Sequence, residues 1–413
     1  MADRLPRLLA IMGSGETSPT MSKVHRELFA RLGASVPALV LDTPFGFQEN
    51  ADDIAARAVD YFRESVNRDV KVATFRSADE IGSIEHETML ARLSEAQWVF
   101  SGPGSPSYAV AQWRASPAAA LLADKLRKGG CVVFASAAAA TLGPVTLPVY
   151  EIYKVGAAPH WLEGLDLLSI AGLCAAVIPH FNNAEGGNHD TRYCYMGERR
   201  LRMLEEQLPD DVFVLGVDEH TALIFDLGAG SATVAGLGGV TVRRRDGSAR
   251  IESGQTMSIR CLSNLAAQTA AAEPAGVTAS PTPVRSPLLD DLAGLEAHFA
   301  DALAARDARA AVEAILRLDD LVVDWSRDTL QSDELDRGRA AFRAMVVRLG
   351  EAAEGGMRDE REVVGPFVEA LLEARQQARA DNRWDQADAI RDRLTAAGVE
   401  VKDRPEGTDW QVG

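Results

Sequence analysis

Short apolar runs alternate with longer amphipathic stretches between residues 7 and 243, and this alternation restricts the fold more than any other feature. Each apolar run has the length of a strand buried on both faces. The stretches between them repeat apolar residues at helical spacing. The apolar runs are 8–12, 38–41, 70–74, 98–100 and 131–134, and the helical stretches are 22–32, 52–66 and 86–93. We therefore predict an α/β fold with a mostly parallel sheet sandwiched by helices.

After residue 212 the pattern changes to short strands separated by turns. These strands are expected at 212–217, 221–225, 232–235 and 240–243, with a hairpin turn at 245–247. Strands joined by tight turns pair antiparallel. We expect them to form an antiparallel edge that completes the same sheet.

Composition divides the chain into two parts. Residues 268–287 contain four prolines and almost no large apolar side chain, which is typical of a flexible linker. Residues 289–394 repeat apolar side chains three and four positions apart, which predicts a bundle of four or five helices. We predict an α/β domain at 1–267, a linker at 268–287, and a small all-α domain with a short terminal β element at 288–413.

Charge and cysteine content argue against several classes of protein. The net charge of -17 opposes non-specific attraction to nucleic acid or to anionic membranes. No run of about 18 apolar residues is present, so no membrane span is expected. The four cysteines are widely spaced, which fits a reducing cytoplasm and predicts no zinc site. We expect a cytoplasmic protein without a cofactor, and a homodimer remains compatible with the sequence.

Residues of the kind that bind metals are scattered. His160, His189, His220, Asp190 and Glu219 show no paired ligand spacing, so no metal site is predicted. Asp218-Glu219-His220 follows a predicted strand near the expected rim of the site. That turn can either contact substrate or lie in solvent.

The candidate nucleophile is Ser136. It follows the apolar strand 131–134 and precedes a run of alanines, as in a strand-to-helix nucleophile elbow. Phe134 and Ala138 stand where such elbows usually have glycine. Taken alone, the segment favours a serine that caps the following helix.

Four motifs in order strengthen the enzymatic interpretation. They are Ser101-Gly102-Pro103-Gly104-Ser105 after a strand, Phe-Ala-Ser136-Ala-Ala, Glu151 fifteen residues later, and Ile178-Pro-His180-Phe-Asn-Asn183. In this order the motifs resemble the dipeptidase E and cyanophycinase family of serine peptidases. The resemblance spans about residues 7 to 243 and implies the class I glutamine amidotransferase-like fold.

The resemblance also implies a site. Ser136 would be the nucleophile, His180 the base and Glu151 the acid that orients it. The amides of Gly104 and Ala137 would face the oxyanion. The expected substrate is a small peptide or related amide, with an acidic residue beside the cleaved bond as that family prefers.

Departures from the family pattern keep other functions open. Pro103 removes a backbone donor, and Ala138 adds a methyl group at the elbow. A non-catalytic binding protein on a degenerate hydrolase scaffold is the alternative. Amidotransferase-like glutamine hydrolysis needs a cysteine at the elbow, where this chain has Ser136.

The last 47 residues carry a second resemblance. Three motifs in this stretch are similar to the C-terminus of cysteinyl-tRNA synthetase. They are a predicted helix with Arg375-x-x-x-Arg379, an Ala-Asp-Ala-Ile-Arg-Asp segment, and Asp403-Arg-Pro-Glu-Gly-Thr-Asp-Trp410. The preceding helices, from residue 288, fit the rest of that domain less distinctly, and the resemblance implies an anticodon-binding-like domain at 288–412. The candidate tRNA contacts are Arg375, Arg379, Lys402, Asp403, Arg404 and Trp410.

The residues of this tail also allow a packing role. Ala387, Ile390 and Leu394 form an apolar stripe, and Trp384 with Trp410 can anchor it. Residues 285–413 hold 18 Arg and Lys against 28 Asp and Glu, so any contact with tRNA or a translation partner should be weak. The nucleotide-binding signatures of a synthetase are absent from the sequence, so aminoacylation is not expected.

Overall fold

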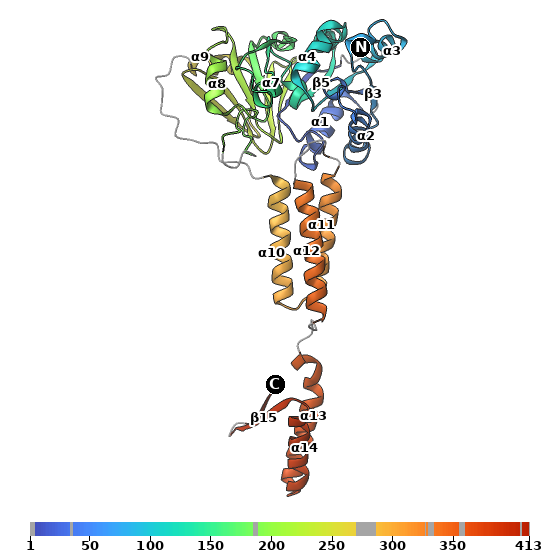
Figure 1. Ribbon diagram of the computed structural model, residues 1–413, viewed down its shortest axis with the longest axis vertical. Helices are drawn as coiled ribbons and strands as arrows, with labels where there is room; N and C mark the ends of the chain where they lie inside the picture. The colour runs from blue at the N-terminus through green and yellow to red at the C-terminus, as the bar shows by residue number, and fades with distance from the viewer. Residues whose placement is uncertain are drawn as a thin grey trace. The chain divides into compact units, whose positions relative to one another are not determined.

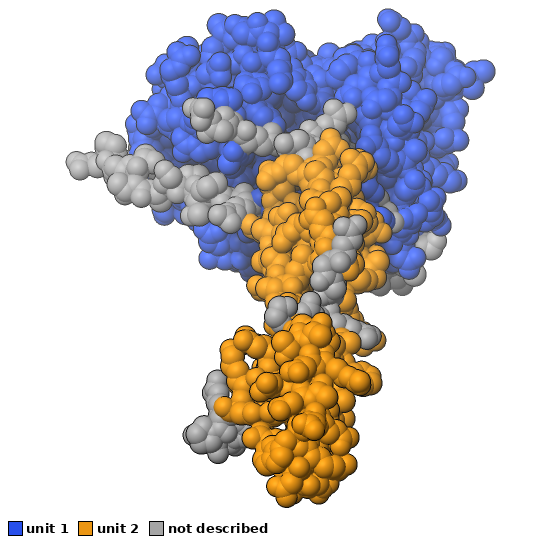
Figure 2. Space-filling model, turned by 60° about the horizontal axis from the view of Figure 1, so that its bottom comes forward, with its two compact units in different colours: residues 1–287, 323–333 blue, residues 288–322, 334–413 orange. Residues whose placement is uncertain are grey.

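The computed structural model describes residues 5–33, 36–184, 189–269, 286–326, 328, 334–354, 360–404 and 407–412. These residues divide into two compact units (Figure 2). The first comprises residues 1–287 and 323–333, and the second comprises 288–322 and 334–413. Most of the predicted linker 268–287 lies outside the described residues.

A large sheet dominates the first unit (Figure 1). In the described part of the chain it has eight strands, in the order β14-β11-β10-β1-β5-β4-β2-β3. The strands from β1 to β3 in this order run parallel, whereas β10, β11 and β14 pair antiparallel. Their bounds are β1 Arg7–Met12, β2 Ala38–Leu41, β3 Lys71–Ala73, β4 Trp98–Ser101, β5 Gly130–Ala135, β10 Thr221–Asp226, β11 Ser231–Gly236 and β14 Thr256–Ser258. The prediction of a mostly parallel sheet is confirmed.

The late strands do not all join this sheet. A second sheet has the order β13-β12-β9-β8, with β8 Ala175–Ile178, β9 Phe213–Val217, β12 Gly239–Arg244 and β13 Gly247–Glu252. β8 runs parallel to β9, and the others pair antiparallel. The sequence pattern missed this division because a strand's apolar residues do not identify the strand it pairs with. A short ribbon, β6 Val145–Thr146 with β7 Leu162–Glu163, completes the pairing.

Helices cover both faces of the large sheet because its strands are apolar on both sides. Along β1, Leu9 and Ile11 enter one core cluster, and Leu8, Ala10 and Met12 enter the other. The first cluster also receives α3, α4, α5 and α9, and the second receives α1 and α2. The helices of this unit are α1 Ser22–Leu32, α2 Ala51–Tyr61, α3 Ile84–Glu95, α4 Pro106–Ala115, α5 Ala118–Lys128, α6 Ser136–Ala139, α7 Val149–Tyr153, α8 Gly197–Glu205 and α9 Ile259–Thr269.

The second unit contains two small cores. One is formed by α10 Pro287–Ala304, α11 Ala308–Trp325 and α12 Glu334–Glu354 around Phe299. The other is formed by α13 Glu360–Ala380, α14 Trp384–Ala396 and the hairpin of β15 Val399–Arg404 with β16 Gly407–Val412. The expected helices and terminal β element are confirmed. None of the described helices combines the length and apolar character needed to cross a bilayer.

Substitution of Phe134 tests how much the core beneath the candidate site contributes to stability. Phe134 is fully buried in β5, and its ring stacks on Trp113 at 5.2 Å between centroids. Phe134→Ala should lower the free energy of unfolding by about 3 to 5 kcal/mol, because it leaves a cavity in a packed core. Urea denaturation measures this loss. Phe47→Ala, whose side chain is half exposed, is the matched control; equal losses in both variants would contradict this account of the core.

Candidate active site

Ser136 lies at a sharp turn between β5 and α6. All six residues of β5 are buried, and the chain passes directly from Ala135 into the helix at Ser136. Ser136 has φ of 47°, in the left-handed region that few non-glycine residues occupy. Such strain is found at nucleophile elbows, where it holds the hydroxyl above the end of the sheet. Ala138 is fully buried in the larger core cluster, so this elbow has room for the extra methyl group.

A chain of hydrogen bonds joins Ser136 to an imidazole and a carboxylate. Ser136 Oγ lies 2.9 Å from His180 Nε2, and His180 Nδ1 lies 2.9 Å from Glu219 Oε1. The histidine thus presents one ring nitrogen to the hydroxyl and the other to the acid. This is the arrangement in which imidazole can remove a proton from serine while a carboxylate stabilises the resulting cation.

Glu219 occupies the position expected for Glu151. The predicted acid instead accepts a hydrogen bond from Ser107 Oγ at 2.5 Å through its Oε1, next to a Ser105–Ser107 contact of 2.9 Å at the start of α4. The reason lies in the second sheet. Ile178 of β8 pairs with Gly216 of β9, so the loops that follow these parallel strands meet. His180 and Glu219 lie on those two loops.

Two asparagines after His180 hold Glu219 in place. Asn182 Oδ1 accepts the Glu219 backbone N–H at 2.8 Å, and Asn183 Nδ2 donates to Glu219 Oε1 at 3.2 Å. Burial by itself would raise the pKa of Glu219, but the hydrogen bond and charge of His180 bring that pKa below its ordinary value. Glu219 is therefore ionised at neutral pH. The sequence signal was the Asp218-Glu219-His220 turn, which sequence analysis could assign either to substrate contact or to solvent.

Two backbone amides are suited to hold an oxyanion. The N–H groups of Gly104 and Ala137 have no hydrogen-bond partner among the described residues. Gly104 has φ of 137°, and a Cβ built on it would lie 2.0 Å from the Pro44 carbonyl oxygen, so only glycine fits there. The elbow and this loop are joined by the Ala138 amide, which donates to the Gly102 carbonyl at 3.2 Å. Pro103 offers no N–H, and the two expected donors do not require one.

Glu16 is an acid of this region that was not among the predicted site residues. Its side chain is fully buried, and neither carboxylate oxygen has a hydrogen-bond partner among the described residues. Burial and, to a smaller extent, the negative charge of Asp328 raise the pKa of Glu16 from 4.5 to about 7, although the charge of His180 opposes the shift. Perturbed carboxyl groups of this kind concentrate at functional sites.

The scattered residues of the kinds that bind metals do not form a metal site in the described part of the chain. Among the described residues, no three His, Cys, Asp or Glu side chains are arranged to hold a metal ion. Asp190 binds Arg192 at 2.8 Å, and His160 is exposed. His220 Nδ1 lies 2.9 Å from Thr20 Oγ1, and burial lowers the pKa of this histidine to about 4. His220 is therefore neutral at neutral pH.

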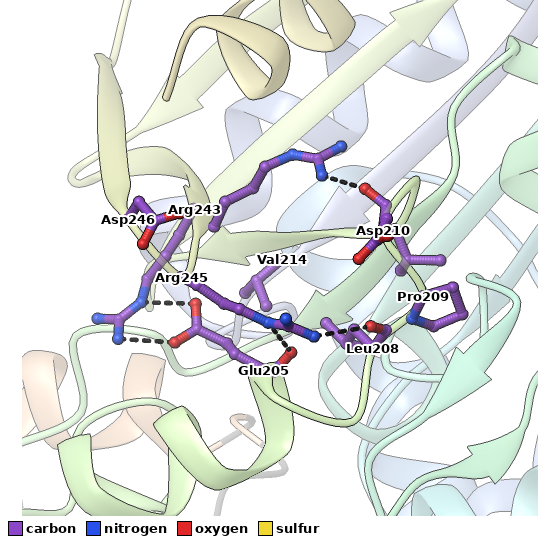
Figure 3. A pocket seen from close by; sticks show the side chains of 10 residues that line it. Glu205, Leu208, Pro209, Asp210, Val214, Arg243, Arg245 and Asp246 are labelled. Atoms are coloured by element: carbon purple, nitrogen blue, oxygen red, sulfur yellow. Dashed lines mark hydrogen bonds and ion pairs between the residues drawn. The ribbon is translucent and has the colours of Figure 1, made fainter. Parts of the chain in front are cut away.

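A pocket of about 240 Å³ lies away from these groups, beside β9 and β12 (Figure 3). Arg243 is its most buried cation and makes ion pairs with Glu205 at 2.9 Å and with Glu198 at 2.8 Å. Arg245 donates to the Glu205 carbonyl at 3.0 Å. Because these cations already have partners, the pocket has the character of a structural ion-pair network.

In the C-terminal part, three of the six predicted RNA contacts form an internal network or core. Arg375 is 4 % exposed and binds Asp403 through two hydrogen bonds of 2.8 Å. These bonds hold the pKa of Asp403 well below its ordinary value. Trp410 is buried in the core of the same unit. Arg375, Asp403 and Trp410 therefore stabilise the β-hairpin against α13, and their assignment as RNA contacts stays a prediction.

The remaining candidates lie nearer the surface. Arg379 is partly exposed and contacts Asp403 at 3.3 Å, and Lys402 is half exposed, 3.1 Å from Glu400. The side chain of Arg404 lies outside the described residues. Trp384 is 54 % exposed, and the Arg379 guanidinium lies 6.0 Å from its ring centroid. From the sequence, Trp384 could anchor the apolar stripe of Ala387, Ile390 and Leu394, but most of its side chain surface is exposed.

Comparisons with known proteins agree with this division. Residues 364–410 match the family model described as the cysteinyl-tRNA ligase anticodon binding domain. A cysteine--tRNA ligase of Arthrobacter sp. (strain FB24) is 53% identical over 57 residues, which cover 13% of this chain and 12% of that protein. The corresponding enzyme of Chlorobium luteolum is 40% identical over 90 residues, or 20% of this chain and 19% of the relative. The chain thus spans less than a fifth of the length of these two curated relatives.

A solved structure resembles the larger part of the chain. The crystal structure of a peptidase from an acI-B1 Actinobacterium superposes with a TM-score of 0.50 at 20% identity, and the match covers 62% of this chain and 98% of that one. At this identity the likeness concerns the fold. The protein therefore combines a peptidase-like α/β fold with a C-terminal segment similar to the anticodon-binding domain of cysteinyl-tRNA ligase.

Glu16→Gln should stabilise the protein at alkaline pH. The pKa of Glu16 is 4.5 in a model peptide and about 7 in the folded chain, so the folded state binds its proton more tightly. The contribution of Glu16 to stability therefore falls as the pH rises from about 4.5 to about 7, by about 3 kcal/mol in total, and changes little outside this range. Urea unfolding at pH 8 and pH 4.5 measures the difference. A Gln variant that is less stable than the wild type at pH 8 would contradict this prediction.

Proposed function

We propose that the protein is a serine hydrolase that cleaves a small peptide or related amide, with Ser136 as nucleophile, His180 as base and Glu219 as the orienting acid. The hydrogen-bond chain from Ser136 Oγ through His180 to Glu219, with both contacts at 2.9 Å, carries this proposal. The peptidase-like fold is consistent with it. The preference for an acidic residue beside the cleaved bond, implied by the sequence resemblance, is part of the same proposal.

In the acylation step, Ser136 Oγ attacks the carbonyl carbon as its proton passes to His180 Nε2. The ionised Glu219 stabilises the imidazolium and holds the tautomer that accepts at Nε2. Negative charge on the carbonyl oxygen is received by the N–H groups of Gly104 and Ala137, and one such donor is typically worth about 3 kcal/mol.

The amine product and then the acid product leave in two stages. His180 gives its proton to the departing amine as the C–N bond breaks, leaving an ester on Ser136. Water attacks this ester as His180 takes its proton; the bond between the acyl carbon and Ser136 Oγ then breaks, His180 returns the proton to Ser136 Oγ, and the carboxylic acid product leaves. Each step returns His180 to the neutral form in which it began.

Substitutions at the three positions test the proposal. With a fluorophosphonate probe, Ser136→Ala should abolish labelling because the attacking oxygen is gone. Glu219→Gln should slow labelling by about 100- to 10,000-fold, as expected for loss of the acid in a triad. Glu151→Gln is the matched carboxylate control and should label within about threefold of the wild type.

The outcomes separate the alternatives, provided that circular dichroism shows each variant to be folded. Labelling that persists in Ser136→Ala would identify another nucleophile. No labelling of the native wild type would favour the non-catalytic binding protein. A large loss in Glu151→Gln with none in Glu219→Gln would reverse the assignment of the acid.

For the C-terminal part we propose weak binding to RNA that positions the hydrolase. The match of residues 364–410 to an anticodon-binding family supports this role. Trp384 and Arg379 offer a stacking plane and a cation on one exposed surface. The excess of acidic residues in 285–413 keeps the expected affinity low.

Titration of the full chain with unmodified tRNA tests this role. We expect a Kd above about 10 µM at about 0.15 M salt, and Trp384→Ala should weaken binding at least about threefold through the loss of stacking. Phe367→Ala removes another exposed aromatic from the same part of the chain and serves as the control. Equal affinity in all three proteins would argue against an RNA surface at Trp384.

A further inference from the structure

Glu16 is an ionisable group beside the candidate site that the proposed reaction does not use. It is fully buried, and both carboxylate oxygens lack a hydrogen-bond partner among the described residues. An unpaired buried carboxylate is costly to the folded state. A glutamine of nearly the same shape would avoid the burial of charge, which suggests that the charge at Glu16 has a use.

The position of Glu16 is set by three neighbouring segments. It follows β1, whose last residue Met12 pairs with Ala135, the residue before Ser136. The same loop binds the His180 segment, because the His180 backbone N–H donates to the Gly13 carbonyl at 3.3 Å. These contacts place the loop of Glu16 beside both the nucleophile and the base.

The carboxylate itself reaches the loop after β4. A Cβ built on Gly102 would lie 2.9 Å from Glu16 Oε1, which is closer than real Cβ contacts permit. β4 and β1 lie on opposite sides of β5 in the sheet. Glu16 therefore extends past the elbow of Ser136, and the glycine at 102 leaves space for its carboxylate.

Few charged groups face Glu16. A positive charge on His180 lowers the pKa of Glu16, and the negative charge of Asp328 raises it. Asp328 is a residue of the first compact unit and accepts a hydrogen bond from Thr17 Oγ1 at 3.1 Å. From α1, His25 bonds the Glu16 carbonyl at 2.7 Å, and burial lowers its pKa to about 4; from α2, Tyr61 has a raised pKa through burial. Both are neutral near pH 7.

We propose that Glu16 is a second carboxylate of the site, a positioning residue whose charge favours the protonated form of His180. The inference rests on the proposed hydrolase function. Coupling between two ionisable groups is reciprocal, so a histidine cation that stabilises ionised Glu16 is itself stabilised by Glu16. When the Ser136 proton moves to His180 Nε2, Glu16 gains a favourable interaction and exchanges no atom. Glu219 stabilises the His180 cation through a hydrogen bond at Nδ1. Glu16 stabilises the same cation through the electrostatic attraction of its negative charge, which is strong because the region is shielded from water.

The pH profile of Ser136 labelling by a fluorophosphonate tests the proposal in the full chain. In the wild type the rate should rise as His180 loses its proton. Glu16→Gln removes a negative charge, so His180 should lose its proton more easily, and the midpoint should move to lower pH by about half a unit or more. The limiting rate at high pH should fall about three- to tenfold, because the base is weaker and the imidazolium is less stabilised.

The controls separate electrostatics from folding. Glu16→Asp keeps the charge and should keep the midpoint near that of the wild type, whatever its rate. Glu151→Gln removes a carboxylate near the site that contacts Ser107, and should leave the midpoint unchanged. A purely structural role of Glu16 would change the yield of folded protein or the rate, but not the midpoint. An unchanged midpoint in folded Glu16→Gln overturns the inference.

A second measurement distinguishes failure of this inference from failure of the proposed function. The pKa of the His180 imidazole can be followed by NMR without any reaction. If the wild type is not labelled but the pKa of His180 falls in Glu16→Gln, the hydrolase proposal fails and the coupling stands. If labelling is normal and the pKa of His180 is the same in both proteins, the coupling fails and the hydrolase proposal stands.

Discussion

The hydrogen bond between Ser136 and His180 joins two sheets, and the candidate site depends on how these sheets are held. Ser136 follows β5 in the centre of the large sheet, while His180 and Glu219 follow β8 and β9 of the smaller one. Apolar residues from both sheets share one core cluster, and the Gly13 carbonyl on the β1 loop binds the His180 backbone. Because a dense core resists small displacements, the distance between hydroxyl and imidazole is set by packing well away from the reacting atoms.

Strained backbone and buried charge occur together where the two sheets meet. Ser136 and His180 both have φ of 47°, and each such residue costs the folded state on the order of 1–3 kcal/mol. Glu16 adds an unpaired buried carboxylate. The surrounding strands are almost entirely apolar and buried, and their packing offsets these costs. Backbone strain and an unpaired buried charge, held in place by a well-packed core, are typical of a functional site.

In the C-terminal part, the residues of one matched motif divide between the packed interior and the exposed surface. The Arg375 and Asp403 pair locks the β-hairpin onto α13, and this pair belongs to the segment that matches an anticodon-binding family. Trp384 and Arg379, by contrast, lie together at the surface. A motif therefore identifies the architecture more directly than it identifies the contacting side chains.

The sequence by itself determined the alternating strands and helices and the strand-to-helix turn at Ser136, because these features follow from local periodicity and from motifs within one segment. The pairing of Ser136 with His180 was implied only by the family resemblance. Only the tertiary structure decided that Glu219, not Glu151, contacts His180, because β8 and β9 pair across the 34 residues between them, 179–212. It also decided that the late strands form two sheets and that Arg375 and Trp410 face inward. These outcomes depend on which strands and helices become neighbours, and no single segment carries that information.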